Sequence, residues 1–453
     1  MSQKKPIGFG FRGWMLILFQ AIAYITFQVF TQYPLNILSD FYGGATVVSK
    51  YYSICAIVGI LIQLILVPVI GKMKNLKALC CTLGGVTLVL AYVVMSQPAG
   101  TLWIVCYCLI NVTSVLYATM TLGLLVGQWF PTRKGTVMGI ATLAFPIANG
   151  LLGVFAGNVF GPIGAMSAQG IPFNPFQIIQ SAFLPFFIIS VVGWLIGVIF
   201  IKDYPEQVGA FRDNDRSMTP EVANAIMLAE IENKKTSVWT IPHAIASKEF
   251  WFSTLTNALL LGCSIGLMSQ SQAIITNAGE GMPDYTIVMG MIMIFGMIGS
   301  FVLGLLDTRI GTRKAMMIST VLMVIAGILG IIGSGVALLI AMIFVALFMG
   351  AASNFGVSCA AQYWRREDFG RIFMLSSPIG SLISSAAPMV VASLLFGMTG
   401  YKGPTGVFTL VLVCGVIAFL CMLLFKPAHI KEQDDKYRAA VGKEADEALA
   451  GRK

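Results

Sequence analysis

The chain carries the stretch QWFPTRKG at residues 128–135, which leads into LAFPI at 143–147. An aromatic pair, a short basic loop, a glycine and a proline inside an apolar run follow one another there. The same order recurs 232 to 235 residues later, as QYWRR at 362–366, Gly370 and LSSPI at 375–379. This repeat predicts two similar halves, in which the helices that carry Pro146 and Pro378 are equivalent and kinked by those prolines.

Long apolar runs around both stretches predict membrane-spanning helices, each of about 20 residues. The spans are expected near 14–38, 46–70, 77–96, 101–127, 136–160, 176–201, 250–276, 284–306, 315–333, 336–362, 371–397 and 405–425. The predicted fold class is therefore all-α: a polytopic membrane protein whose 12 helices form two pseudo-symmetric six-helix bundles.

A long polar segment, 202–248, separates the two sets of spans. It predicts an N-terminal bundle at 1–201, a cytoplasmic linker at 202–248, a C-terminal bundle at 249–425 and a cytoplasmic tail at 426–453. Within the linker, Thr219 as N-cap before a proline and an acid predicts a surface helix to about Lys235. His243 and the pair Asp213/Asp215 are interpreted as solvated loop residues.

Composition supports the membrane assignment. Hydrophobic residues make up 57% of the chain and charged residues 11%, and the mean hydropathy is +0.84. These values lie outside the balance of a soluble domain. The net charge of +9 suggests contact with lipid headgroups, not with nucleic acid, because the basic residues flank the spans. All nine cysteines fall in apolar spans and are interpreted as small core residues, with no metal or disulfide framework.

Basic residues predict the orientation. Of 29 in the chain, 27 fall in seven segments that share one side of the predicted topology. Because Lys and Arg stay in the cytoplasm during insertion, both termini are expected there, with the protein multi-pass in a plasma membrane of the bacterial inner-membrane type. The exceptions are Lys50 and Lys402.

The junction at 129–141 resembles the helix 4–5 junction of the oxalate/formate antiporter-like and monocarboxylate transporter-like branches of the major facilitator superfamily. The superfamily's loop motif is visible as Gly304, Asp307, Arg309, Gly311, Arg313 and Lys314, with one extra residue between acid and glycine. The resemblance implies that Asp307 and Arg313 help to latch the two halves together. The alternative is a juxtamembrane charge pair that satisfies helix ends.

The chain departs from these branches in its charges. They commonly hold a carboxylate with a basic residue in helix 8 or 11, whereas 284–306 and 372–397 contain no Lys or Arg. No acid or histidine lies near mid-membrane either, because Asp40, Glu280 and Asp284 sit at outer ends. This distribution favours facilitated diffusion, exchange or entry of a protonated acid over proton symport through a buried carboxylate.

Uncharged polar residues are the candidate binding groups. The resemblance implies that helices 1, 4, 7 and 10 line a central cavity. The predicted substrate-binding residues are Tyr24, Gln28, Gln32, Lys50, Asn111, Tyr117, Asn149, Asn257, Gln270 and Asn354. For each amide the alternative is an interhelical hydrogen bond. For Lys50, which could attract an anion at the outer vestibule, the alternative is snorkelling to the headgroups.

The predicted function is secondary transport of a small organic solute, a monocarboxylate-like organic anion, by alternating access as exchanger or facilitator. A drug/proton exporter of the same fold is the alternative. A receptor is disfavoured because the tail of 28 residues from Lys426 is too short for a soluble signalling domain. An enzyme is disfavoured because the sequence shows no nucleophile, base and orienting residue at one depth. No cofactor or metal is expected, and the protein is predicted to be a monomer.

Overall fold

A computed structural model describes residues 8–70, 75–130, 133–215, 217, 219, 221–222, 225, 228, 238–397 and 400–450. In this part of the chain, 12 helices are long and apolar enough to cross a membrane, as predicted. The greater part of the surface helix expected between Thr219 and Lys235 lies outside the described residues. The described backbone N–H of Val222 does donate to Thr219 Oγ1, at 3.4 Å.

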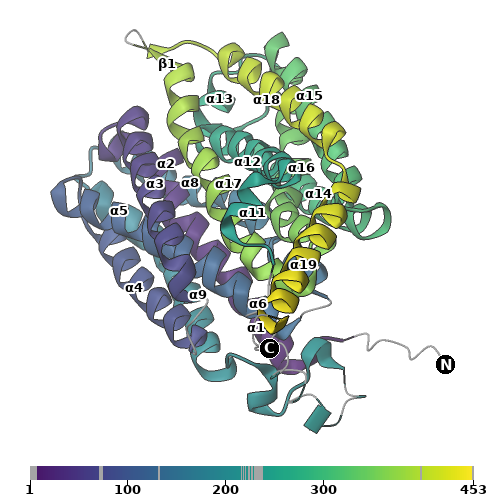
Figure 1. Ribbon diagram of the computed structural model, residues 1–453. Coiled ribbons are helices and arrows are strands. Elements are labelled where there is room, and N and C mark those ends of the chain that lie inside the picture. Colours follow the sequence, from purple (N-terminus) through teal and green to yellow (C-terminus); the bar gives the residue numbers. More distant parts are fainter. Residues whose placement is uncertain are drawn as a thin grey trace.

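The first six spans run antiparallel to their neighbours in sequence (Figure 1). They are α1 (Gly10–Phe27) continued by α2 (Tyr33–Asn36), α3 (Ala45–Ile70), α4 (Leu76–Ser96), α5 (Thr101–Val115) continued by α6 (Leu122–Trp129), α7 (Lys134–Ala141) continued by α8 (Ala144–Ala168), and α9 (Pro175–Phe200). Two wide π-helical turns, Gln28–Gln32 and Leu116–Thr121, join α1 to α2 and α5 to α6.

The last six spans follow the linker, whose end forms α11 (Ile241–Ala246). They are α12 (Lys248–Ser269) continued by α13 (Ser271–Thr276), α14 (Tyr285–Ile310), α15 (Thr312–Ile332), α16 (Gly335–Tyr363), α17 (Arg366–Leu395) and α18 (Thr405–Leu424). A short hairpin, β1 (Phe396–Gly397) with β2 (Gly400–Tyr401), connects α17 to α18. The tail forms α19 (Pro427–Ala450).

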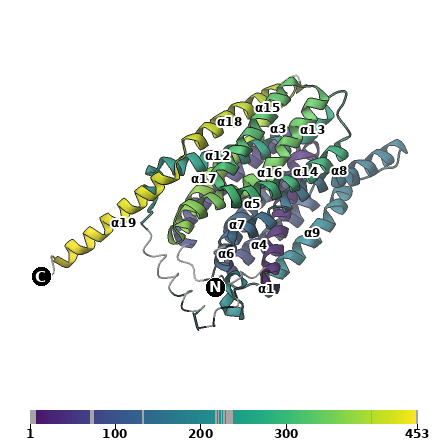
Figure 2. The same ribbon diagram turned by 90° about the vertical axis from the view of Figure 1, so that its right-hand side faces the viewer.

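The helices gather in two groups, purple to blue and green to yellow in Figure 1. Helices α1 to α9 pack mainly on one another, as do α12 to α18, and the groups meet where α3 contacts α17 and α8 contacts α14. We call the side with Gly10 and Leu424 the terminal face, and the side with Gly43 and Gly279 the opposite face. Helix α19 projects from the terminal face (Figure 2).

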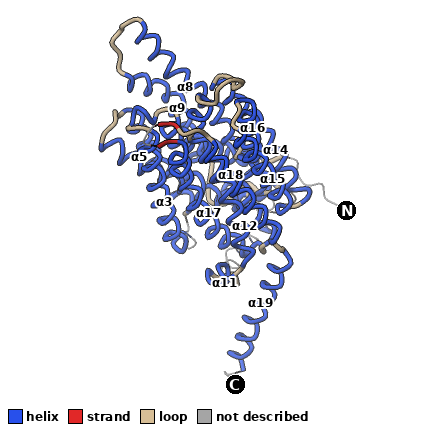
Figure 3. Tube along the Cα trace, turned by 90° about the horizontal axis from the view of Figure 1, so that it is seen from above, coloured by secondary structure: helices blue, strands red, loops and turns tan. Residues whose placement is uncertain are grey.

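The two prolines behave differently. Pro146 has no N–H for the carbonyl of Thr142, and the fifth span is interrupted there, between α7 and α8. Pro378 lies inside α17, which continues through it. Helix α8 also runs eight residues past the expected end at 160, and with the start of α9 it extends beyond the bundle (Figure 3).

The interpretation of every cysteine as an unbonded core residue is wrong. A disulfide joins Cys55 of α3 to Cys108 of α5. The residues are 53 positions apart, and only the packing of α3 on α5 brings them together. Cys80, Cys106 and Cys263 are buried, as expected of core residues.

Candidate functional site

A cavity of about 170 Å³ lies between the two groups of helices. This is room for a small organic solute and more than a single water needs. It follows α12 from Phe250, near the terminal face, to Met268, near the opposite face. Among the described residues that line it, none is charged.

Amide side chains form the polar part of the N-terminal wall. Gln28 donates from Nε2 to Asn149 Oδ1 at 3.0 Å, and Gln32 donates to the Tyr52 hydroxyl at 2.6 Å. Asn149 in turn donates to Met349 Sδ of the other group, at 3.3 Å. The π-helical turn at 28–32 carries both glutamines to the cavity. Tyr24 lies one turn earlier and contacts Phe145, with the ring centroids 4.7 Å apart and the rings tilted by 36°.

The structure thus brings five of the predicted binding residues to the cavity wall: Tyr24, Gln28, Gln32, Asn149 and Asn257. The other five lie elsewhere. Asn111 is buried and donates to the Tyr107 carbonyl of its own helix. Tyr117 is buried against Phe19, and Lys50 is exposed.

Gln270 and Asn354 instead join the two groups of helices. Gln270 donates to Ser49 Oγ at 3.2 Å, and Asn354 donates to Thr142 Oγ1 at 2.9 Å. These are the interhelical hydrogen bonds of the alternative interpretation.

Sequence reasoning missed a hydroxyl-rich wall. Serines of α17 line the cavity together with hydroxyl residues of α12 and α16: Ser253, Thr254, Ser264, Ser353, Ser376, Ser377, Ser381, Ser384 and Ser385. Serine is common in spanning helices, so single serines carry little signal. The spacing of Ser377, Ser381 and Ser385 by four residues was the available clue, because it places them on one face.

On the opposite face, Asn36 closes the space between the groups. The seventh span is interrupted between α12 and α13, which leaves backbone groups without helical partners. Asn36 Nδ2 donates to the Met268 carbonyl at 2.6 Å and to Ser271 Oγ at 2.8 Å, and its Oδ1 accepts from the Gln272 N–H at 3.3 Å. One side chain therefore binds both sides of the interruption.

Asp307 and Arg313 stay within the C-terminal group. Asp307 accepts from Thr312 Oγ1 at 2.5 Å. Arg313 donates to the carbonyls of Met422 and Leu423, at the end of α18, at 3.1 and 2.9 Å. These contacts lie at helix ends, and the latching role of the two residues stays a prediction.

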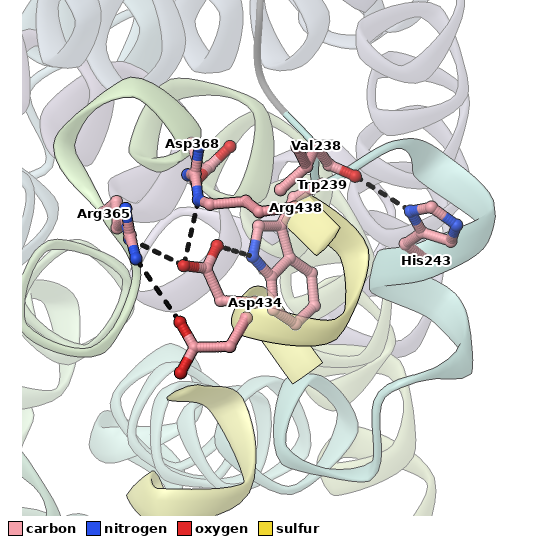
Figure 4. Close-up of polar contacts among 8 residues, drawn as sticks. Val238, Trp239, His243, Arg365, Asp368, Asp434 and Arg438 are labelled. Atoms are coloured by element: carbon pink, nitrogen blue, oxygen red, sulfur yellow. Dashed lines mark hydrogen bonds and ion pairs between the residues drawn. The ribbon is translucent and has the colours of Figure 1, made fainter. Parts of the chain in front are cut away.

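Polar contacts fasten the tail helix α19 to the start of α17 and to the end of the linker (Figure 4). Asp434 accepts from Trp239 Nε1 at 3.2 Å and pairs with Arg365 at 2.6 Å. Arg438 pairs with Asp368, which is fully buried, at 2.9 Å. We call these five residues the tail clasp.

The clasp also reaches the linker and the cavity. The His243 ring stacks on Tyr437 at 3.9 Å and its Nδ1 bonds to the Val238 carbonyl, so His243 is not a solvated loop residue. Asp213, likewise, accepts from the Arg133 N–H. Trp239 packs edge-on against Trp364, which lines the cavity.

We expect Arg438→Ala to destabilise the protein by about 2 kcal/mol, because the buried Asp368 carboxylate loses a hydrogen-bonded charged partner on α19. The melting temperature of the purified protein, followed by size-exclusion chromatography after heating, measures the loss. Lys436→Ala is the matched control, since Lys436 is exposed on the same helix. Equal losses in the two variants would contradict a stabilising clasp.

Comparison with known proteins places this architecture. The sequence profile described as Major Facilitator Superfamily matches residues 16–388. The chain belongs to that superfamily. This superfamily member is therefore a multi-pass membrane transport protein and not an enzyme.

Solved structures of the superfamily share its fold. One is the proton:xylose symporter XylE bound to 6-bromo-6-deoxy-D-glucose, with a TM-score of 0.65 and 11% identity over 91% of this chain and 96% of that one. Another is a bacterial homologue of the human drug peptide transporters PepT1 and PepT2, with a TM-score of 0.58 and 14% identity over 93% and 97% of the two chains. Comparison with curated proteins finds no match.

Proposed function

We propose that this superfamily member moves a small organic solute, a monocarboxylate-like organic anion, across the membrane as exchanger or facilitator. The observation that carries the proposal is the uncharged cavity between the two groups of helices, which Asn36 closes on the opposite face. A cavity between two bundles that rock against each other suits alternating access. The bundles are 1–201 and 249–425, with the linker 202–248 and the tail 426–453.

The two kinds of wall favour a solute with one polar end. Amides and hydroxyls line part of the cavity, and aromatic side chains such as Phe27, Phe145 and Phe373 line much of the rest. A short monocarboxylate presents a head group that accepts hydrogen bonds and an apolar body that prefers such surfaces. Because no described lining residue is charged, hydrogen-bond donors hold the head group.

The same proposal includes the setting of the protein. Both termini lie in the cytoplasm, the membrane is of the bacterial inner-membrane type, and the protein works as a monomer among lipids. Basic residues such as Arg12, Arg133 and Lys426 flank the spans on the terminal face. A drug/proton exporter is the competing function, and it requires a titratable group that changes its exposure during transport.

Counterflow in proteoliposomes tests the proposal, with labelled acetate, propionate and lactate as the panel. We expect the wild type to exchange at least one of them and to keep this exchange when an uncoupler abolishes the proton gradient. Asn149→Leu removes the partner of Gln28 and Met349 and is expected to lower the exchange at least tenfold. Ser393→Ala, on the exposed side of α17, is the control. No exchange of any panel member overturns the substrate class, and uncoupler-sensitive drug efflux favours the exporter.

A further inference from the structure

The two walls of the cavity differ in how far their polar groups are already satisfied. In the N-terminal wall the amides of Gln28 and Asn149 bond to each other, and Gln32 bonds to Tyr52. A solute that used these groups would first have to break the bonds between them. That exchange gains little, because one hydrogen bond replaces another.

In the C-terminal wall, three hydroxyl groups are unused. Serine in a helix commonly donates to a carbonyl three or four residues earlier, as Ser376, Ser384 and Ser393 of α17 do. Ser377, Ser381 and Ser385 make no such bond to any residue in the described ranges. They lie four residues apart on the face of α17 that lines the cavity.

A second helix brings further unpaired groups to the same place. Thr254 of α12 is only 5% exposed, and its hydroxyl has no hydrogen-bond partner among the described residues. Oδ1 of Asn257, one turn further along α12, also has no partner among the described residues, but this oxygen only accepts hydrogen bonds and therefore does not bind a carboxylate. Both residues line the cavity. A Cβ atom on Gly380 would lie 3.9 Å from Thr254 Cγ2, so Thr254 sits level with the α17 segment between Ser377 and Ser381.

A buried polar group without a partner is costly, as the Thr254 hydroxyl is. The serine hydroxyls beside it are partly exposed to the cavity, so a ligand there can accept hydrogen bonds from them. We infer that Ser377, Ser381 and Thr254 form the head-group site for the carboxylate of the transported solute. This inference rests on the proposed function and assigns the head group to α17 and α12, not to the amides of helix 1. The serine and threonine hydroxyls rotate to donate to the carboxylate oxygens. Hydrogen bonds to an ionised acceptor are about twice as strong as neutral ones, which compensates for the uncharged lining.

The N-terminal wall then contacts only the apolar body of the bound solute. The body of the solute packs against Phe27 and Phe145, while the pairs formed by Gln28 and Gln32 stay intact. During rocking, the head group travels with the C-terminal bundle.

The test is counterflow of the panel carboxylate that the wild type exchanges, measured for Ser377→Ala, Ser381→Ala and the double variant. We expect the KM to rise about tenfold for each single variant and more for the double, because each change removes one donor to an ionised acceptor. The melting temperature should not change, since these hydroxyls bond to no described residue. Ser381→Thr keeps the hydroxyl and is expected to keep most of the affinity. Ser393→Ala, whose hydroxyl is bonded to the Met389 carbonyl on the exposed side, should match the wild type.

Competition by the matched primary amides, acetamide, propionamide and lactamide, identifies the chemistry that is recognised. We expect the wild type to prefer the carboxylate, and the double variant to lose most of this preference. The assignment is overturned if the serine variants keep the wild-type KM. It is also overturned if the amide inhibits exchange by the wild-type protein as strongly as the unlabelled acid does. If the wild type exchanges no panel member, the substrate class fails first and the head-group site falls with it. That result is distinguishable, because it does not depend on the variants.

Discussion

Gly299→Ala is expected to destabilise the protein by about 3 kcal/mol or more, the upper end of the cost of overpacking a core. Helices α14 and α16 cross at Gly299, where an added Cβ would press on the backbone carbonyl of Leu347, with the carbonyl carbon only 2.5 Å away. Backbone cannot rotate aside as a flexible side chain does, so one helix must move away from the other. At Gly350, on α16, an added Cβ would meet the Ser300 hydroxyl, so the crossing is tight in both directions.

The measurement is the fraction of protein that stays monodisperse in detergent after heating, compared across a temperature series. Gly290→Ala is the matched control, because Gly290 lies on the same helix and an added Cβ there would have no heavy atom within 4 Å. Alanine favours a helix over glycine, so this control should be neutral or slightly stabilising. If both variants lose monodispersity at the same temperature, the close crossing of α14 and α16 does not limit stability.

Asn36→Leu is expected to open the opposite face. The change removes three hydrogen bonds between the two groups of helices. The Met268 carbonyl, the Ser271 hydroxyl and the Gln272 N–H, which lie at the interruption between α12 and α13, then lose this partner. At about 1 kcal/mol for each bond, the equilibrium between the state closed on the opposite face and the state open on that face shifts about a hundredfold toward the open state. Water satisfies these groups once the face has opened, so the open state loses nothing by the substitution.

Spin labels at the exposed positions Val47 and Glu280, in a background without free cysteines, report the separation of the groups on this face. We expect a short distance to dominate in the parent protein and a longer one in Asn36→Leu, with slower counterflow. Asn277→Ala is the control, because Asn277 is exposed and bonds only within its own segment. An unchanged distance distribution would show that other contacts keep the face closed.

The fold was predictable because its signals are local. Apolar run length and the side on which Arg133 or Lys426 falls are read directly from the chain, and the repeated proline helices relate the halves. Helix boundaries were harder to predict: α8 continues to Ala168 through Gly161 and Pro162, two residues that ordinarily favour the end of a helix. The disulfide between Cys55 and Cys108 depends on which helices pack together, and spacing does not contain that information.

The site was predictable only where polarity is rare. Gln28 and Gln32 are conspicuous in an apolar helix, and both reach the cavity. Asn111 is equally conspicuous, yet its amide is used within its own helix, by the carbonyl of Tyr107. Whether an amide bonds locally or faces a cavity depends on its rotamer and neighbours. Conversely, Ser381 looks ordinary in sequence and matters through what it does not bond to.

The tail helix α19 allows movement of the C-terminal bundle to be followed from outside the membrane. Helix α19 has 24 residues, and Asp434 and Arg438 fasten its first half. The 12 residues after Arg438 project for about 18 Å. Because the tail clasp holds α19 on the C-terminal bundle, α19 moves with the bundle when the bundle rotates. A fluorophore at the exposed Val441, one turn beyond Arg438, would therefore report movement of the bundle from the aqueous phase, without any label inside the membrane.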